Sequence, residues 1–254
     1  AALEYARPLK LTVVVPDGDY NIDTSIVLDK QAMIALGGNA RFLTSNTNGV
    51  TSNANQVFSI VWLKDSCLLD GFKFKGSGRA SVYNLGTGVF PTQNGIRISG
   101  NANRVLNSDF RDLYGFCIYQ NDEAFTTFDG NVISGFKATK STGLFMNYYA
   151  GQYGLITSGF ADSLRIGFVE YGNNNTHSSY TIERCDKAGV VNNGVGDDHD
   201  MFSAINMNHC NNLYFTSLQH GVNLDNCQLW YTNIVGTNAD RLMITGGAFG
   251  QMNV

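Results

Sequence analysis

The sequence has few charged residues and no cluster of lysine and arginine. Only 15% of its 254 residues are charged, and the formal net charge at pH 7 is −4. A protein that follows a phosphate backbone gathers basic residues along one face or element, so the composition argues against a nucleic-acid partner. No apolar run approaches the roughly 20 residues of a membrane-spanning helix, which argues against membrane insertion. No signal-peptide pattern opens the chain, and its abrupt ends predict a fragment of a longer protein.

Closely spaced cysteine pairs are also absent. The five cysteines are Cys67, Cys117, Cys185, Cys210 and Cys227, and none forms a Cys-x-x-Cys pair. This spacing argues against a structural zinc site. The sequence therefore predicts free, buried thiols in a protein that is made in a reducing cytoplasm.

Helical periodicity is nearly absent, and only the opening AALEYA predicts a short helix. The chain has 3 prolines against 28 glycines. Elsewhere it consists of short β-branched and aromatic runs separated by Gly, Asn, Asp and Ser, the pattern of strands and turns. The sequence therefore predicts an all-β protein.

A degenerate repeat runs along the chain. Segments such as VISGF, LITSGF and TIERCD each place an aliphatic residue before small or polar residues and a Phe or Cys. Aligned on Phe110, Phe136, Phe160, Cys185 and Cys210, the segments recur about every 25 residues, within the range of solenoid repeats. Such a period without helical patterning predicts a parallel β-helix, in which stacked coils bury a face that one coil cannot bury alone. A sandwich or barrel would give turns about every 8–12 residues without this register.

Stacked coils would form internal ladders, with aligned positions about 4.8 Å apart. The predicted aliphatic ladder contains Leu106, Ile133, Ile156, Ile182, Ile205, Leu224 and Ile244. The predicted aromatic ladder contains Phe110, Phe136 and Phe160 and passes into Cys185, Cys210 and Cys227.

The N-terminal segment resembles the opening of pectate-lyase-superfamily proteins, where an alanine-rich helix precedes a strand, a "vPxGxY" motif and two further strands. The corresponding pieces are VVVP (13–16), DGDY (17–20), SIVL (25–28) and IALGG (34–38). The resemblance implies a single-stranded right-handed parallel β-helix with a short N-terminal capping helix. The cap and first strands would occupy residues 1–40 and the β-helix residues 41–254.

Within that superfamily the chain is similar to bacteriophage tailspikes and capsule depolymerases. The similarity lies in its Asn-, Gly- and Tyr-rich composition, its loop-heavy coils and the lack of a signal-peptide pattern. It implies a homotrimer on a virion tail that binds and cleaves a bacterial surface polysaccharide, such as capsule or O-antigen. No cofactor is expected.

The segment NNGVGDDHDMF, residues 192–202, concentrates acidic residues in a charge-poor chain. Asp197, Asp198, His199 and Asp200 follow the strand that starts at the repeat anchor Cys185, and polar residues follow the other anchors at similar distances along the chain. Stacking would place them all on one flank. The other predicted members of the flank are Asp122, Glu123, Asn147, Tyr148, Tyr149, Glu170, Tyr171, Gln219 and His220.

A flank of carboxylates and tyrosines suits a polysaccharide, because rings offer flat apolar faces and polar groups fix hydroxyls. Glycoside hydrolysis needs two carboxyl groups around the scissile bond. Glu170 would lie one coil, roughly 5 Å, from Asp197 and Asp198, and two coils, roughly 10 Å, from Glu123. We therefore predict Glu170, Asp197 and Asp198 as catalytic residues of an endo-glycosidase and the rest of the flank as substrate-binding residues.

Other interpretations stay open at the level of sequence. The aspartates could bond backbone amides in a solvated turn. Their spacing is not that of an EF-hand calcium loop, so no metal is predicted. The protein could also be a non-catalytic receptor-binding or structural fibre, or a polysaccharide lyase with Arg165 or Lys187 as its base.

Overall fold

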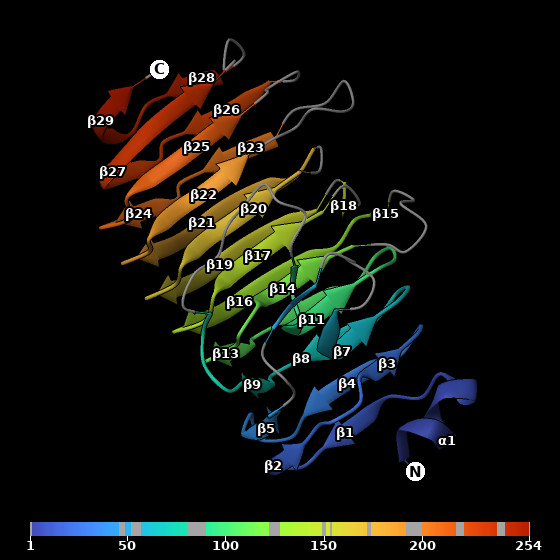
Figure 1. Cartoon of the computed structure of the whole chain (residues 1–254). Coiled ribbons are helices and arrows are strands. Elements are labelled where there is room, and N and C mark those ends of the chain that lie inside the picture. The colour runs from blue at the N-terminus through green and yellow to red at the C-terminus, as the bar shows by residue number, and fades with distance from the viewer. Residues whose placement is uncertain are drawn as a thin grey trace.

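The chain winds as a parallel β-helix whose coils stack along one axis, with the N-terminal helix at one end and the C-terminus at the other (Figure 1). The computed structural model describes residues 2–45, 49–51, 57–80, 90–121, 128–148, 151–152, 154–171, 174–191, 200–216, 221–237 and 242–253. The predicted fold class is confirmed, and so is the opening helix, α1 (Ala2–Leu9). Among the described residues, no helix has the length and apolar character needed to cross a membrane.

Each coil contributes to three parallel sheets, named here in chain order. Sheet 1 contains β1 (Val13–Val15), β4 (Ala32–Ala35), β8 (Leu68–Asp70), β12 (Arg104–Leu106), β23 (Asp200–Ser203), β26 (Val222–Asp225) and β28 (Leu242–Thr245). Sheet 2 contains β2 (Gly18–Asn21), β5 (Ala40–Leu43), β9 (Lys73–Lys75), β13 (Asp109–Arg111) and β24 (Asn206–Asn208). Sheet 3 contains β3 (Ile26–Leu28), β7 (Phe58–Leu63), β11 (Gln93–Ile98), β14 (Phe116–Gln120), β17 (Gly143–Asn147), β20 (Ile166–Glu170), β22 (Lys187–Val191) and β25 (Asn212–Thr216).

Long strands take part in two sheets. β16 (Val132–Thr139), β19 (Leu155–Asp162) and β21 (Thr176–Glu183) pass from sheet 1 into sheet 2. β27 (Gln228–Thr237) and β29 (Ala248–Asn253) pass from sheet 2 into sheet 3. Two short pairs lie outside the coil sheets, β6 (Val50–Thr51) with β10 (Phe90–Pro91), and β15 (Phe128–Asp129) with β18 (Gly151–Gln152).

Two corners of the coil are tight because single residues with positive φ turn the chain. Between sheets 1 and 2 these are Gly71, Asn107, Gly135, Ser158, Ser179, Ala204, Asn226 and Gly246. Between sheets 2 and 3 they are Asp112, Lys140, Ser163, Arg184, His209 and Tyr231. From β13 onward the longer connections therefore run at the third corner, from sheet 3 to sheet 1 of the next coil, whereas in the first coils the longest segments, 44–57 and 76–92, join sheet 2 to sheet 3.

The predicted aliphatic ladder is correct in part. Ile133, Ile156, Leu224 and Ile244 do share the inward column of sheet 1. This column reads Val105, Ile133, Ile156, His177, Phe202, Leu224 and Ile244. Leu106 is one residue out of register, and Ile182 and Ile205 lie outside the column. The spacing between successive members is uneven along the chain, so a constant period loses the register.

The predicted aromatic ladder is wrong. Phe110 pairs with Ala138, Phe136 with Gly159, and Phe160 with Lys137, so the three rings occupy three columns. Of the cysteines that were to continue it, Cys185 and Cys210 each follow a positive-φ residue at the corner between sheets 2 and 3, whereas Cys227 follows Asn226 at the corner between sheets 1 and 2. All five cysteines are free and buried, as predicted.

An aromatic ladder does exist, in the N-terminal half of sheet 2. Tyr20, Phe42, Phe74 and Phe110 share its inward column. The rings of Phe74 and Phe110 stack at a centroid distance of 4.9 Å. We expect Phe110→Ala to lower the unfolding free energy by about 3–5 kcal/mol, because it leaves a cavity in this stack. Denaturant unfolding measures this. Phe160→Ala, at a half-buried position that does not face the core, is the control and should cost clearly less; equal losses would contradict the assigned columns.

Candidate functional site

The segments predicted to form the flank all begin at one edge of sheet 3, where the chain leaves that sheet in each coil. One continuous ladder pairs Gln120, Asn147, Glu170, Val191 and Phe215. The first four are the last residues of their strands, and Phe215 is next to last in β25. Each predicted site segment follows one of these strand ends along the chain. The segments predicted to form the flank therefore start from stacked positions on successive coils.

Most of the predicted site residues are not described by the structure. Asp122, Glu123, Tyr149, Asp197, Asp198, His199, Gln219 and His220 lie outside the described residues. The described members are Asn147, Tyr148, Glu170, Tyr171 and Asp200.

The carboxylate of Glu170 lies inside the coil and not on the flank. Side chains alternate along a strand, and Phe168 packs in the core while Val169 packs in a separate buried cluster. Glu170 therefore faces inward, and its side chain has 0% exposure. Asn147 and Asp200 are buried as well. The expectation that these three residues line an exposed surface is corrected, because a polymer cannot reach them in this structure.

Glu170 is held by three buried donors. Asn147 Nδ2 donates to its Oε1 at 2.6 Å, and Asn175 Nδ2 donates to the same oxygen at 3.3 Å. His177 Nε2 lies 3.2 Å from Oε2. His177 Nδ1 lies 2.9 Å from the Tyr180 hydroxyl. Together with Asp200, these residues form what we call the interior polar cluster: Asn147, Glu170, Asn175, His177, Tyr180 and Asp200.

The histidine of this cluster is neutral at pH 7. Burial lowers the pKa of His177 to about 4, although the Coulombic effect of Asp200 opposes the shift. A neutral ring has one donor and one acceptor, so Nε2–H donates to the Glu170 carboxylate and Nδ1 accepts from Tyr180. Burial also raises the pKa of Tyr180 well above its usual value, which keeps its hydroxyl proton in place. His177 stacks on Phe202 at a centroid distance of 4.6 Å and so takes the place of an aliphatic core residue.

Asp200 occupies a position that asparagines hold in other coils. At the corner before sheet 1, the Cys67 amide donates to Asn103 Oδ1, and the Asn103 amide donates to Asn131 Oδ1. The Asn175 amide donates in the same way to Asp200 Oδ1 at 2.9 Å. Asp200 Oδ2 is buried and has no hydrogen-bond partner among the described residues. Burial, with a smaller contribution from Glu170, raises the pKa of Asp200 well above its usual value.

Tyr148 and Tyr171 are the described residues that do lie on the flank. They directly follow β17 and β20 on successive coils, and both are half-buried. Their rings meet edge to face at a centroid distance of 6.1 Å and an angle of 71°. Both pack against a second buried apolar cluster, which contains Val57, Phe116, Tyr119, Met146, Ile166, Val169 and Val190. The pair therefore forms a supported aromatic surface at the base of the flank.

The two candidate lyase bases lie at the other end of the sheet 3 strands. Arg165 directly precedes β20, pairs with Asp186 at 2.6 Å and donates to the Ala80 carbonyl. Lys187 begins β22 and lies over the Tyr214 ring. A strand of five residues separates this end from the flank by roughly 13 Å of rise. The structure does not bring these cations to the tyrosine pair.

No protein-family model matches the sequence, and no curated protein sequence matches it. Among solved structures, the chain is similar to the A-module of mannuronan C-5 epimerase AlgE6 from Azotobacter vinelandii, with 11% identity, a TM-score of 0.48, and coverage of 100% of this chain and 90% of the other. It is also similar to the PL6 family alginate lyase AlyGC, with 12% identity, a TM-score of 0.58 and coverage of 94% and 36%. A third likeness is to the enzymatically active domain of bacteriophage CBA120 tailspike protein 2, with 10% identity, a TM-score of 0.45 and coverage of 96% and 42%. The chain thus spans well under half of the second and third of these chains. At this level of identity the likeness to the alginate lyase shows a shared fold, the parallel β-helix.

Proposed function

We propose that the chain binds and cleaves a bacterial surface polysaccharide on the flank where it leaves sheet 3. The observation that carries the proposal is the single ladder of strand ends, from which the acidic and tyrosine-bearing segments all start. This arrangement supports a linear binding surface along the axis, which suits a polymer. The fold shared with an alginate lyase is compatible with it.

The reaction we propose is endo-glycoside hydrolysis by carboxylates. Asp197 and Asp198 are the proposed pair, one protonating the leaving glycosidic oxygen and the other acting on the opposite face of the sugar as base or nucleophile. Water supplies the hydroxyl group that ends on the anomeric carbon. Tyr148 and Tyr171 offer ring faces to the sugar. Glu170 is not proposed as a catalytic acid, because its carboxylate is enclosed.

The test is cleavage of surface polysaccharide by Asp197→Asn and Asp198→Asn. We expect at least one variant to lose about 100-fold or more in the rate of reducing-end release, the usual contribution of a positioned acid or base, while glycan binding is retained. Asp225→Asn, on sheet 1, is the matched control and should keep full activity. Full activity of both aspartate variants would discard this site.

The products separate the alternative functions. An unsaturated, ultraviolet-absorbing product would identify a lyase, and tight binding without any product would identify a receptor-binding fibre. The proposal also includes a homotrimeric phage tailspike as the setting of the reaction. A monomeric mass in light scattering would contradict the homotrimer. The cleavage assay would still test the reaction.

A further inference from the structure

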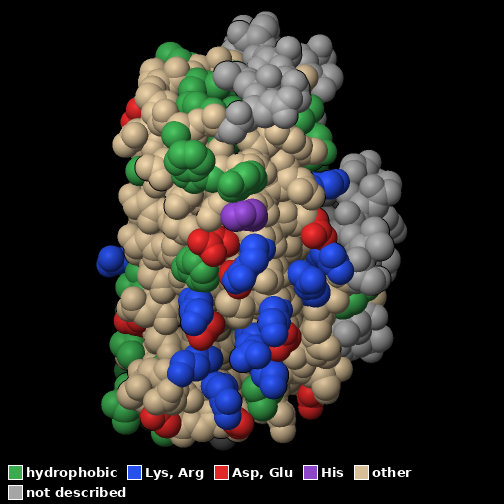
Figure 2. All heavy atoms as spheres, turned by 90° about the vertical axis from the view of Figure 1, so that its left-hand side faces the viewer, with side chains coloured by type: hydrophobic (Ala, Val, Ile, Leu, Met, Phe, Trp, Pro, Cys, Tyr) green, Lys and Arg blue, Asp and Glu red, His purple; other side chains and the backbone are tan. Residues whose placement is uncertain are grey.

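The outer face of sheet 2 gathers basic side chains over the N-terminal coils (Figure 2). The core residues Phe42, Phe74 and Phe110 point inward from β5, β9 and β13, so their neighbours along each strand point outward. We call this surface the cationic face: Arg41, Lys73, Lys75, Arg111, Lys137 and Lys140. It stands out because the whole chain carries a net charge of −4.

Like charges are paired directly across this face. Arg41 is in register with Lys73, and Lys75 is in register with Arg111. Like charges directly opposite each other in a sheet are destabilising. Side-chain packing does not require cations at these positions, because all of these side chains point away from the core. A negatively charged ligand would offset the repulsion.

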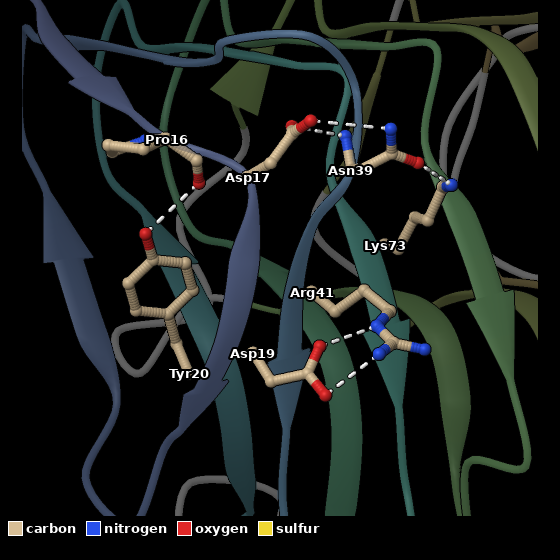
Figure 3. Close-up of polar contacts among 7 residues, drawn as sticks. All are labelled: Pro16, Asp17, Asp19, Tyr20, Asn39, Arg41 and Lys73. Atoms are coloured by element: carbon tan, nitrogen blue, oxygen red, sulfur yellow. Dashed lines mark hydrogen bonds and ion pairs between the residues drawn. The ribbon is translucent and has the colours of Figure 1, made fainter.

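Part of the cationic face is held in place by neighbouring polar groups (Figure 3). Asp19 accepts two hydrogen bonds from Arg41, at 2.6 and 2.8 Å. Lys73 Nζ donates to Asn39 Oδ1 at 2.6 Å, and the Asn39 backbone amide donates to Asp17 at 2.9 Å. These contacts order the side chains before any ligand arrives, which lowers the entropy lost on binding.

Other cations of this face are not neutralised in the same way. Within the part of the chain that the structure describes, Lys75, Lys137 and Lys140 take part in no ion pair. Asp109 lies in register between Lys73 and Lys137, and Arg111 pairs with Asp112 at 3.3 Å. Six cations therefore face three carboxylates, those of Asp19, Asp109 and Asp112. The face therefore keeps an excess of positive charge.

A polar pocket opens beside Lys75. It has a volume of about 420 Å³ and is lined by Asn21, Asp23, Leu43, Thr44, Ser45, Lys75 and Gly76. Amide and hydroxyl groups in a pocket of this size suit a hydroxylated ligand. Asp23 and Lys75 bring one charge of each sign to the wall, and Arg111 on the next coil adds a second cation, so the Lys75 side of the pocket suits a sugar unit that carries an anionic group.

The outward-facing column of sheet 2 that contains Lys75 and Arg111 continues toward an aromatic surface. From Lys75 and Arg111 it passes on successive coils through Thr139, Asp162, Glu183 and Asn208 to Trp230. Arg184 pairs with Asp162. Trp230 is 49% exposed and the neighbouring Tyr231 is 74% exposed, with His209 stacked on Tyr231 at 4.6 Å. An extended glycan on this column would place its anionic groups on the cations and neutral sugar units on the aromatic rings, because the carboxylates of Asp162 and Glu183 lie between the two.

We propose that the outer face of sheet 2 is a second glycan-binding surface, specific for an anionic polysaccharide. Sheet 2 lies between its corners with sheets 1 and 3 and so faces away from the corner between sheets 3 and 1 that carries the flank. The proposal rests on the proposed function for the nature of the ligand, a polysaccharide, and it adds the charge of that ligand and a second place of contact.

The test compares binding of hyaluronan, dextran sulfate and uncharged dextran by calorimetry at low and high salt. We expect at least one anionic polymer to bind and dextran not to bind, with affinity falling as salt rises. Hyaluronan carries carboxylates and dextran sulfate carries sulfates, so the comparison shows which anionic group the surface prefers. The double variant Lys75→Gln/Arg111→Gln should weaken binding roughly three- to tenfold, and Arg104→Gln, an exposed cation of sheet 1, should not.

Three results would overturn this proposal. They are equal binding of dextran, unchanged affinity in the double variant, and tighter binding of single-stranded DNA than of either anionic glycan. Asp198→Asn should keep the binding to sheet 2. Failure of the cleavage site and failure of this surface are therefore separate outcomes.

Discussion

Glu170→Leu is expected to lower the unfolding free energy by roughly 3–5 kcal/mol, because the polar partners of Glu170 would stay buried without their hydrogen-bond acceptor. The variant leaves the Nδ2 groups of Asn147 and Asn175 and the Nε2–H of His177 without the acceptor they now share. Each buried donor left unpaired has a desolvation cost of about 1–3 kcal/mol. Denaturant unfolding at pH 7 measures the loss.

Two variants serve as controls for this experiment. Glu170→Gln keeps one acceptor oxygen and should lose less than Glu170→Leu. Glu183→Gln changes a half-exposed carboxylate at the end of β21 and should stay within about 0.5 kcal/mol of the parent protein. A Glu170→Leu protein as stable as the parent would contradict the hydrogen bonding described here. Loss of cleavage by a fully stable Glu170→Gln protein would instead indicate that Glu170 takes part in the reaction.

Asp200→Asn is expected to stabilise the protein at pH 7, by about 1–3 kcal/mol, because the unfolded aspartate ionises freely while the buried one does not, and asparagine has no such imbalance. Asparagine keeps the oxygen that accepts from the Asn175 amide, as Asn103 and Asn131 do in earlier coils. It also removes a carboxyl group whose charged form is disfavoured by burial. Unfolding at pH 7 measures the gain, and a less stable Asp200→Asn protein would contradict the assignment.

The pH dependence of this gain has a definite sign. The folded-state pKa of Asp200 lies above its unfolded value, so aspartate carries no penalty below pH of about 3.8, where both states are protonated. As the pH rises past that value, the unfolded chain releases its proton and the native aspartate protein loses stability. The advantage of asparagine should therefore shrink as the pH falls toward 4. His177 has the opposite effect, since its lowered pKa makes the native state lose stability as the pH falls from about 6.5 to 4. Both proteins keep this histidine, and Asp200→Asn removes the Coulombic effect that partly opposes the shift.

The sequence was sufficient to predict the coil and the common origin of the flank, because both depend on the order of strands. It was not sufficient to predict which way Glu170 points. All five residues of β20 are buried, since an apolar cluster covers the outer side of sheet 3 as well. A strand buried on both sides loses the alternation that tells its faces apart. A shift of one residue reverses every side chain, so the spacing of Glu170 from Phe160 could not decide its direction.

His177 was missed for a related reason. It lies in THSSYTIE, a polar stretch in which His177, Tyr180 and Ile182 are nevertheless buried, with the turn at Ser179 breaking the alternation. His177 lies in the same inward column as Ile133 and Ile156, and this position could have identified it as a core residue. Using that position requires the lengths of these coils, which are unequal. A constant repeat length counted from Ile156 does not reach position 177.

Carboxyl footprinting with a carbodiimide and an amine, read by mass spectrometry with and without the surface polysaccharide, distinguishes the enclosed carboxylates from those on the flank. Glu170 and Asp200 should stay unmodified in both samples. Asp197 and Asp198 should be modified in the free protein and protected by the polysaccharide. Modification of Glu170 in the free protein, with protection by the polysaccharide, would contradict the enclosed cluster and place that carboxylate on the binding surface.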